Sequence, residues 1–219
     1  MASAGRGWFD DPVDHLLLTW PLHGAPELGS QLLAAYAHPE RSYHDTRHLT
    51  EVLERVHELA AHLPDLAALA VVLAAWFHDA VYDGQPDAEK RSAAWAAEAL
   101  DTLVEPAVVD EVVRLVLLTE HHRPDPDDLN GCTLSDADLA ILASPPDRYA
   151  EYVAGVRAEY AHVPDEMFAR GRGMVLRDLL AKPHLFHTAP ARDAWEERAR
   201  TNIHAELPHL EAASPASPA

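Results

Sequence analysis

The sequence predicts an all-α protein with a single domain. Apolar residues recur at helical spacing along most of the 219 residues, whereas the alternation rich in Val, Ile and Thr that marks strands is nearly absent. The chain is 48% hydrophobic and 24% charged, which is typical of globular rather than disordered proteins. A chain of this length can bury one sizeable core. We expect one domain over residues 1–211 and a disordered tail at 212–219, where the sequence reads AASPASPA.

The helical pattern is interrupted by prolines, which lie at or near the breaks because their missing N–H and fixed φ cost least there. In chain order, the predicted helices span residues 12–20, 26–37, 43–62, 66–82, 87–102, 106–121, 135–143, 147–161, 164–180 and 189–206. The prolines at or near the breaks are Pro21, Pro39, Pro64, Pro86, Pro106, Pro124, Pro145, Pro164, Pro183 and Pro190.

Two segments stand out in this series. The run LAALAVVLAAWF, residues 66–77, is apolar on every side and predicts a buried helix; it is well short of the ~20 residues that cross a bilayer. The segment HHRPDPDDLNGCTL, residues 121–134, contains two prolines, a glycine and three acidic residues, and predicts the clearest loop.

The charge balance limits the classes of partner. Seventeen Lys and Arg against 36 Asp and Glu give a net charge of −19, which repels polyanions and argues against duplex DNA or RNA. Small phosphate esters stay compatible, because one bound metal ion can reverse the local field. The single cysteine, Cys132, cannot form an internal disulfide, which fits a reducing cytoplasm. We expect a cytoplasmic protein without membrane association, and a homo-oligomer is compatible with the sequence.

Polar residues of metal-binding type recur at three places in the helical pattern. The stretch SYHDTRHL carries His44 and His48 at positions i and i+4, which share one helix face. The buried run described above ends in His78 and Asp79, two polar groups that need partners where the core ends.

The third place is LSDADLAIL, where acidic residues lie among apolar neighbours. Asp138 is expected near the core boundary, and Asp136 remains an alternative to it. Nitrogen and oxygen donors of this kind suit an open-sided divalent ion such as Mn, Mg, Fe, Ni, Co or Zn, whereas a closed structural zinc site favours cysteine.

The order of these motifs resembles the HD superfamily of metal-dependent phosphohydrolases, all-helical proteins named for their His-Asp pair. The stretch YHDTRHLTEV is similar to the Tyr-His-Asn-x-x-His signature of cyclic-nucleotide phosphodiesterases, with Asp45 in place of the asparagine. Together with WFHDAVYD and DADLAIL, it looks like a family of uncharacterised bacterial HD-domain proteins. The resemblance runs from about residue 41 to 142 and implies an HD-type helical bundle with its metal-motif core in that range.

The resemblance also implies roles for individual residues. The metal ligands would be His48, His78, Asp79 and Asp138, and His44 would face the substrate as a proton donor. The implied enzyme is a metal-dependent phosphohydrolase that cleaves a small phosphate ester, such as a nucleotide or related metabolite, with metal-activated water.

Three further residues are candidates near this site. Asp45 or Asp83 would hold the imidazolium of the proton donor or orient the water, with Asp83 as a catalytic group and Asp45 as a substrate contact. His122 lies three residues after Thr119, on one helical face, so it either faces the same cleft as a substrate contact or simply complements a helix C-terminus.

Two other functions are compatible with the same motifs. Some HD-type proteins hold two irons and activate O₂, and the extra ligands would have to come from His44, Asp83 and His122. The third reading is a non-catalytic module that keeps the metal pocket to sense a nucleotide. A proton donor at His44 favours catalysis over sensing.

Overall fold

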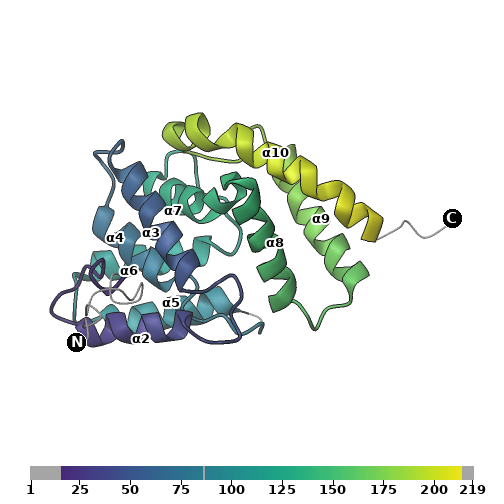
Figure 1. Cartoon of the computed structure of the whole chain (residues 1–219). Helices are drawn as coiled ribbons and strands as arrows, with labels where there is room; N and C mark the ends of the chain where they lie inside the picture. The colour runs from purple at the N-terminus through teal and green to yellow at the C-terminus, as the bar shows by residue number, and fades with distance from the viewer. Residues whose placement is uncertain (1–15, 86, 214–219) are drawn as a thin grey trace, which may run out of the picture.

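The computed structural model describes residues 16–85 and 87–213, and this part of the chain is a single compact all-helical domain without strands, as the sequence predicts (Figure 1). The helices are α2 (Pro26–Tyr36), α3 (Thr46–Ala60), α4 (Ala68–Phe77), α5 (Ala88–Leu100), α6 (Pro106–Leu118), α7 (Leu129–Leu139), the 3₁₀ helix η1 (Ala140–Ala143), α8 (Pro146–Glu159), α9 (Asp165–Ala181) and α10 (Ala189–Ala213). None of the described helices is both long enough and apolar enough to cross a membrane.

Two hydrophobic clusters make up the core. The larger one is formed by α2 to α7, and the smaller one by η1 and α8 to α10. In Figure 1 the long α10 runs along the top of the molecule, with α9 and α8 on the side away from α2 to α7. Helix α3 joins the two clusters, because Val52 packs in the larger one and Leu59 in the smaller one.

Helix α4 lies at the centre of the larger cluster. Its residues from Leu73 to Phe77 are all buried, as expected of a helix that is apolar on every side. It ends at Phe77, five residues earlier than predicted, so His78 and Asp79 lie in the turn that follows it rather than within the helix.

Helix α3 begins at Thr46 rather than at residue 43 as predicted. The carboxylate of Asp45 accepts hydrogen bonds from the N–H groups of Arg47 (2.9 Å) and His48 (3.1 Å), and so caps the helix at this point. His44 therefore precedes the helix, and the prediction that it shares a helix face with His48 is wrong.

The loop predicted at 121–134 is shorter than expected, because α7 begins at Leu129. Asp128 is its N-cap and accepts a hydrogen bond from the Gly131 N–H at 2.9 Å. The segment predicted as one helix at 135–143 is therefore the end of α7 followed by η1.

The chain ends also differ from expectation. Helix α10 continues past residue 206 to Ala213 and includes residues 212 and 213, which were predicted as tail. The rest of the predicted tail, residues 214–219, lies outside the described residues, as do residues 12–15 of the first predicted helix and the break at Pro86.

A buried carboxylate fastens α7 to the segment that leads into α10. Asp136 has no exposed surface and accepts hydrogen bonds from the N–H groups of His187 and Thr188, both at 2.7 Å. Burial raises the pKa of Asp136 to about 6, against the effect of these hydrogen bonds.

Replacement of this carboxylate will destabilise the fold. Asp136→Ala leaves two N–H groups without an acceptor, and we expect it to lower the free energy of unfolding by about 2–4 kcal/mol in urea denaturation. Asp127→Ala, which removes an exposed carboxylate from the turn before α7, serves as the control and should change it by less than about 0.5 kcal/mol. Equal stability of the two variants would contradict this role for Asp136.

Candidate metal centre

Side chains from three separate segments converge at one buried point. His48 comes from α3, His78 and Asp79 from the turn after α4, and Asp138 from the end of α7. The Nε2 atoms of the two histidines are 3.1 Å apart. Donor atoms of His48, His78 and Asp138 all lie within 4.8 Å of one another, so this cluster could hold a metal ion.

The second carboxylate of the His-Asp pair reaches the same point. Asp79 Oδ2 lies 3.4 Å from His48 Nε2 and 3.1 Å from His78 Nε2. Asp138 Oδ1 lies 3.2 Å from His48 Nε2 and 3.7 Å from His78 Nε2. All four residues predicted as ligands are therefore brought together.

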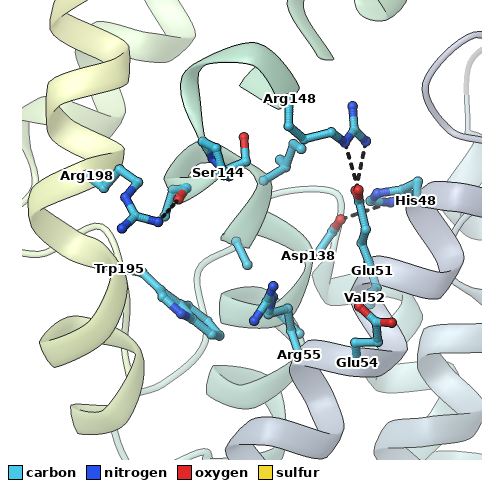
Figure 2. A pocket seen from close by; sticks show the side chains of 15 residues that line it. His48, Glu51, Val52, Glu54, Arg55, Asp138, Ser144, Arg148, Trp195 and Arg198 are labelled. Atoms are coloured by element: carbon cyan, nitrogen blue, oxygen red, sulfur yellow. Dashed lines mark hydrogen bonds and ion pairs between the residues drawn. The ribbon is translucent and has the colours of Figure 1, made fainter. Parts of the chain in front are cut away.

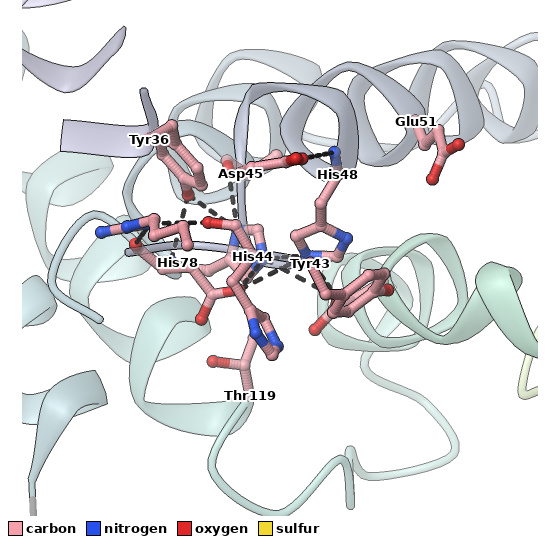
Figure 3. A network of polar contacts seen from close by, with 12 residues as sticks. Tyr36, Tyr43, His44, Asp45, His48, Glu51, His78 and Thr119 are labelled. Atoms are coloured by element: carbon pink, nitrogen blue, oxygen red, sulfur yellow. Dashed lines mark hydrogen bonds and ion pairs between the residues drawn. The ribbon is translucent and has the colours of Figure 1, made fainter. Parts of the chain in front are cut away.

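The end of α4 orients His78 toward the cluster (Figure 3). Its Nδ1–H donates to the carbonyl of Ala75 at 2.8 Å, and a carbonyl can only accept, so in the neutral ring the Nε2 lone pair faces the cluster. This carbonyl would otherwise accept the N–H of Asp79, which donates instead to the hydroxyl of Tyr36 at 3.1 Å. This change of hydrogen-bond partners ends the helix and also orients the imidazole of His78 toward the cluster.

The cluster is held by buried opposite charges. Burial opposes the charged form of every member, yet hydrogen bonds with Asp138 and Asp79 raise the pKa of His48 to about 10. The pKa of His78 is also raised, mainly by Asp79, against the effect of burial. Those of Asp79 and Asp138 are lowered by the histidines, although burial acts in the other direction. Such a set could exchange bound protons for a cation, because a cation offsets the same carboxylate charges.

Arg41 connects the two turns that carry the site. Its guanidinium donates to the carbonyls of His44 (2.9 Å), Asp79 (2.7 Å) and Ala80 (2.9 Å). These bonds fix the turn before α3 against the turn after α4. Sequence reasoning missed this arginine, since no local pattern marks a side chain whose acceptors lie 38 and 39 residues away.

His44 is held by Glu159 at the end of α8. One carboxylate oxygen accepts the N–H groups of Ser42, Tyr43 and His44 at 2.8–3.0 Å, and the other lies 2.7 Å from His44 Nδ1. Burial raises the pKa of Glu159, but its bonds with His44 outweigh this and lower it. Glu159 was also missed, because it lies 115 residues from His44 and in no motif.

The other predicted site residues are placed differently. Asp45 is the helix cap described above, and Asp83 is exposed, where its carboxylate makes a two-point ion pair with Arg91 at 2.7 and 2.8 Å. That ion pair is the main reason why the pKa of Asp83 falls to about 2. These contacts account for both carboxylates structurally, and their predicted roles in substrate binding and catalysis stay predictions.

His122 lies beside the cluster. It follows α6 with a left-handed backbone (φ 47°), and its N–H donates to the carbonyl of Leu118 at 3.0 Å. Its Nε2 is 3.4 Å from Asp138 Oδ2, and its Nδ1 is 3.1 Å from the hydroxyl of Ser135. Burial lowers the pKa of His122, which favours the neutral ring that could act as a donor to a metal.

The choice between the two aspartates of α7 is settled by their contacts. Asp136 accepts hydrogen bonds from backbone N–H groups just before α10, whereas Asp138 contacts the histidines of the cluster. Asp138 is therefore the aspartate of α7 that could bind a metal, as the resemblance to the HD superfamily predicts.

Comparisons with known proteins do not assign the chain to a family. No protein-family model matches the chain, and no curated protein or solved structure matches it either. The helical fold and its buried His-His-Asp cluster are compatible with an HD-type fold.

Metal binding can be tested directly on the cluster. Titration of metal-free protein with Mn²⁺ in a calorimeter should show binding that is lost in His48→Ala, because one of the converging donors is removed. His57→Ala, which alters an exposed histidine of the same helix, should bind Mn²⁺ as the unchanged protein does. Circular dichroism will establish that both variants are folded. Undiminished binding by folded His48→Ala would exclude His48 as a ligand.

Proposed function

We propose that this chain is an HD-type, metal-dependent phosphohydrolase that cleaves a small phosphate ester. The observation that carries the proposal is the position of His44, whose ring centroid lies 5.5 Å from that of His48 while Glu159 holds its Nδ1. A mixed nitrogen and oxygen donor set beside a histidine held in this way provides both a cation site and a group for proton transfer.

In the proposed site, His48, His78, Asp79 and Asp138 are the metal ligands. When bound, a divalent cation lowers the pKa of water toward neutrality and offsets the charge of the phosphoryl group. The absence of thiolate from this donor set favours Mn, Mg, Fe, Ni, Co or Zn in an open-sided site. Cys132 is buried, and burial raises the pKa of its thiol to about 11, so it does not add a thiolate.

The proposed task of His44 is to donate a proton to the leaving oxygen. Because Glu159 occupies Nδ1, the proton is transferred at Nε2. The carboxylate holds the ring of His44 in this orientation, and three bonds from backbone N–H groups keep the carboxylate in place. Glu159 is thus a positioning residue, while His44 is the catalytic one.

One observation favours the alternative function as a di-iron oxygenase. His122 lies against Asp138 and could supply an additional ligand for a second ion. Metal analysis separates the two proposals, because two irons per chain with an optical band on oxidation would contradict the hydrolase.

Phosphate release from a panel of phosphate esters, measured with added Mn²⁺ or Co²⁺, tests the function. We expect Asp79→Ala to abolish turnover through loss of metal binding, and His44→Gln to lower kcat by about 10²–10⁴ while it still binds metal. Loss of metal from His44→Gln would make His44 a ligand. Tight nucleotide binding without release under any metal would favour a sensor.

The role of Glu159 can be tested separately. Glu159→Gln weakens the charged contact that holds Nδ1 of His44, so we expect kcat to fall by about tenfold or more, with KM and Mn²⁺ affinity little changed. Glu151→Gln, an exposed change on the same helix, should leave both kinetic constants unaltered. A matching rise in KM or loss of metal would show that Glu159 acts only on the fold of the site.

A further inference from the structure

A cavity of about 240 Å³ adjoins the candidate metal centre on the side of His48 and Asp138 (Figure 2). Its walls come from α3, from the α7–η1 segment, from the first turn of α8 and the residues before it, and from α10. This volume accommodates about eight water molecules at their ~30 Å³ share of the liquid. It lies below the roughly 300–1,000 Å³ of most pockets for drug-sized ligands, which indicates a small ligand.

Three arginines from three different helices line this cavity. They are Arg55 on α3, Arg148 on α8 and Arg198 on α10 (Figure 2). The chain has 17 basic residues against 36 acidic ones, so three arginines around one small cavity gather an uncommon residue type at one place.

Each of these arginines keeps N–H groups that the described residues do not use. Arg198 has no ion pair among them, and its one hydrogen bond is a long contact of 3.5 Å with the carbonyl of Ala143. Arg148 donates from Nε and Nη2 to Glu51, which leaves Nη1. Arg55 donates to Glu58 from Nη1 alone. The cavity therefore presents arginine N–H groups that are free to donate hydrogen bonds to a ligand.

The cavity lining also carries three carboxylates, Glu51, Glu54 and Asp138, which equal the three arginines in number. Asp138 contacts the histidines of the candidate metal centre. Glu51 is occupied by Arg148 and lies 3.2 Å from Arg47, an arginine outside the cavity lining. Glu54 is exposed at the rim. Ser144 also lines the cavity, and its buried hydroxyl has no hydrogen-bond partner among the described residues. The hydroxyl hydrogen rotates about the Cβ–Oγ bond, so it can be directed to an acceptor.

The aromatic residue of the cavity is poorly placed to stack on a nucleobase. The guanidinium of Arg55 lies over the ring of Trp195, 5.7 Å from its centroid, and the ring makes an edge contact with Phe186. Only 8% of Trp195 is exposed. With the ring covered in this way, polar contacts from arginine dominate what the cavity offers.

From this arrangement we propose that the cavity binds a small oxyanion, a phosphate or carboxylate group, through Arg198 with support from Arg148 and Ser144. Planar guanidinium groups with free N–H donors match the oxygens of such anions. The anion is either free phosphate or a second acidic group of the substrate whose phosphoryl group lies at the metal centre. The binding site itself requires no metal and no turnover.

The first test is calorimetric titration of metal-free protein with inorganic phosphate. We expect one phosphate per chain, with affinity reduced about tenfold or more in Arg198→Gln and by a smaller factor in Ser144→Ala. Arg170→Gln, an exposed change on α9, is the control and should bind as the unchanged protein does. Arg198 is exposed, so its replacement is expected to preserve the fold, which thermal melting will check.

Absence of phosphate binding, or equal binding by Arg198→Gln, overturns the proposal even if the protein proves to be a phosphohydrolase. Conversely, Arg198-dependent binding by a protein without hydrolase activity upholds this site and refutes the proposed function.

A second experiment identifies the source of the anion. It compares the turnover of two phosphate esters by the unchanged protein and by Arg198→Gln, with Mn²⁺ present. 2-Phosphoglycolate and 2-hydroxyethyl phosphate differ only in a carboxylate against a neutral hydroxymethyl group. If the anion belongs to the substrate, Arg198→Gln raises KM about tenfold for the first and leaves the second unchanged. If the site binds free phosphate, both esters respond alike to the substitution, and inorganic phosphate alters their turnover only while Arg198 is present.

Discussion

At the end of α4, the carbonyl of Ala75 accepts the ring N–H of His78 in place of the backbone N–H of Asp79. The hydroxyl of Tyr36 accepts that backbone N–H, so the N–H of Asp79 is not left unpaired. The central helix stops at this exchange, and both side chains of the His-Asp pair turn toward α3 and α7. The helices that pack on α4 then supply His48 and Asp138 to a buried point where each charge has an opposite neighbour.

The site depends on both hydrophobic clusters. His48 and the His-Asp pair belong to the helices of the larger cluster, whereas Glu159 comes from α8, next to the smaller one. Gly155 allows this contact: a Cβ at that position would lie 2.6 Å from the carbonyl oxygen of Ser42. The close approach brings the Glu159 carboxylate to the turn that carries His44, so packing of the later helices positions a residue of the first motif.

Five aspartates of the described residues illustrate three different uses of a carboxylate. Asp45 and Asp128 cap helices, and Asp136 accepts backbone N–H groups in the core. Asp79 and Asp138 face histidines in the candidate metal centre. A carboxylate group is a hydrogen-bond acceptor in the first two uses and a charge partner in the third. The presence of an aspartate therefore does not by itself identify the candidate metal centre.

The sequence by itself determined the all-helical class, the buried central helix and the three motifs that supply His48, His78 and Asp138. Helical periodicity and the spacing within a motif are local properties, so they can be read without knowing how the helices pack. Only the tertiary structure decided that Asp138 rather than Asp136 reaches the cluster. It also decided that Asp45 caps α3 and that Glu159 holds His44, which precedes that helix. Those outcomes depend on contacts between segments far apart in the chain, where packing and hydrogen-bond geometry choose among chemically equivalent residues.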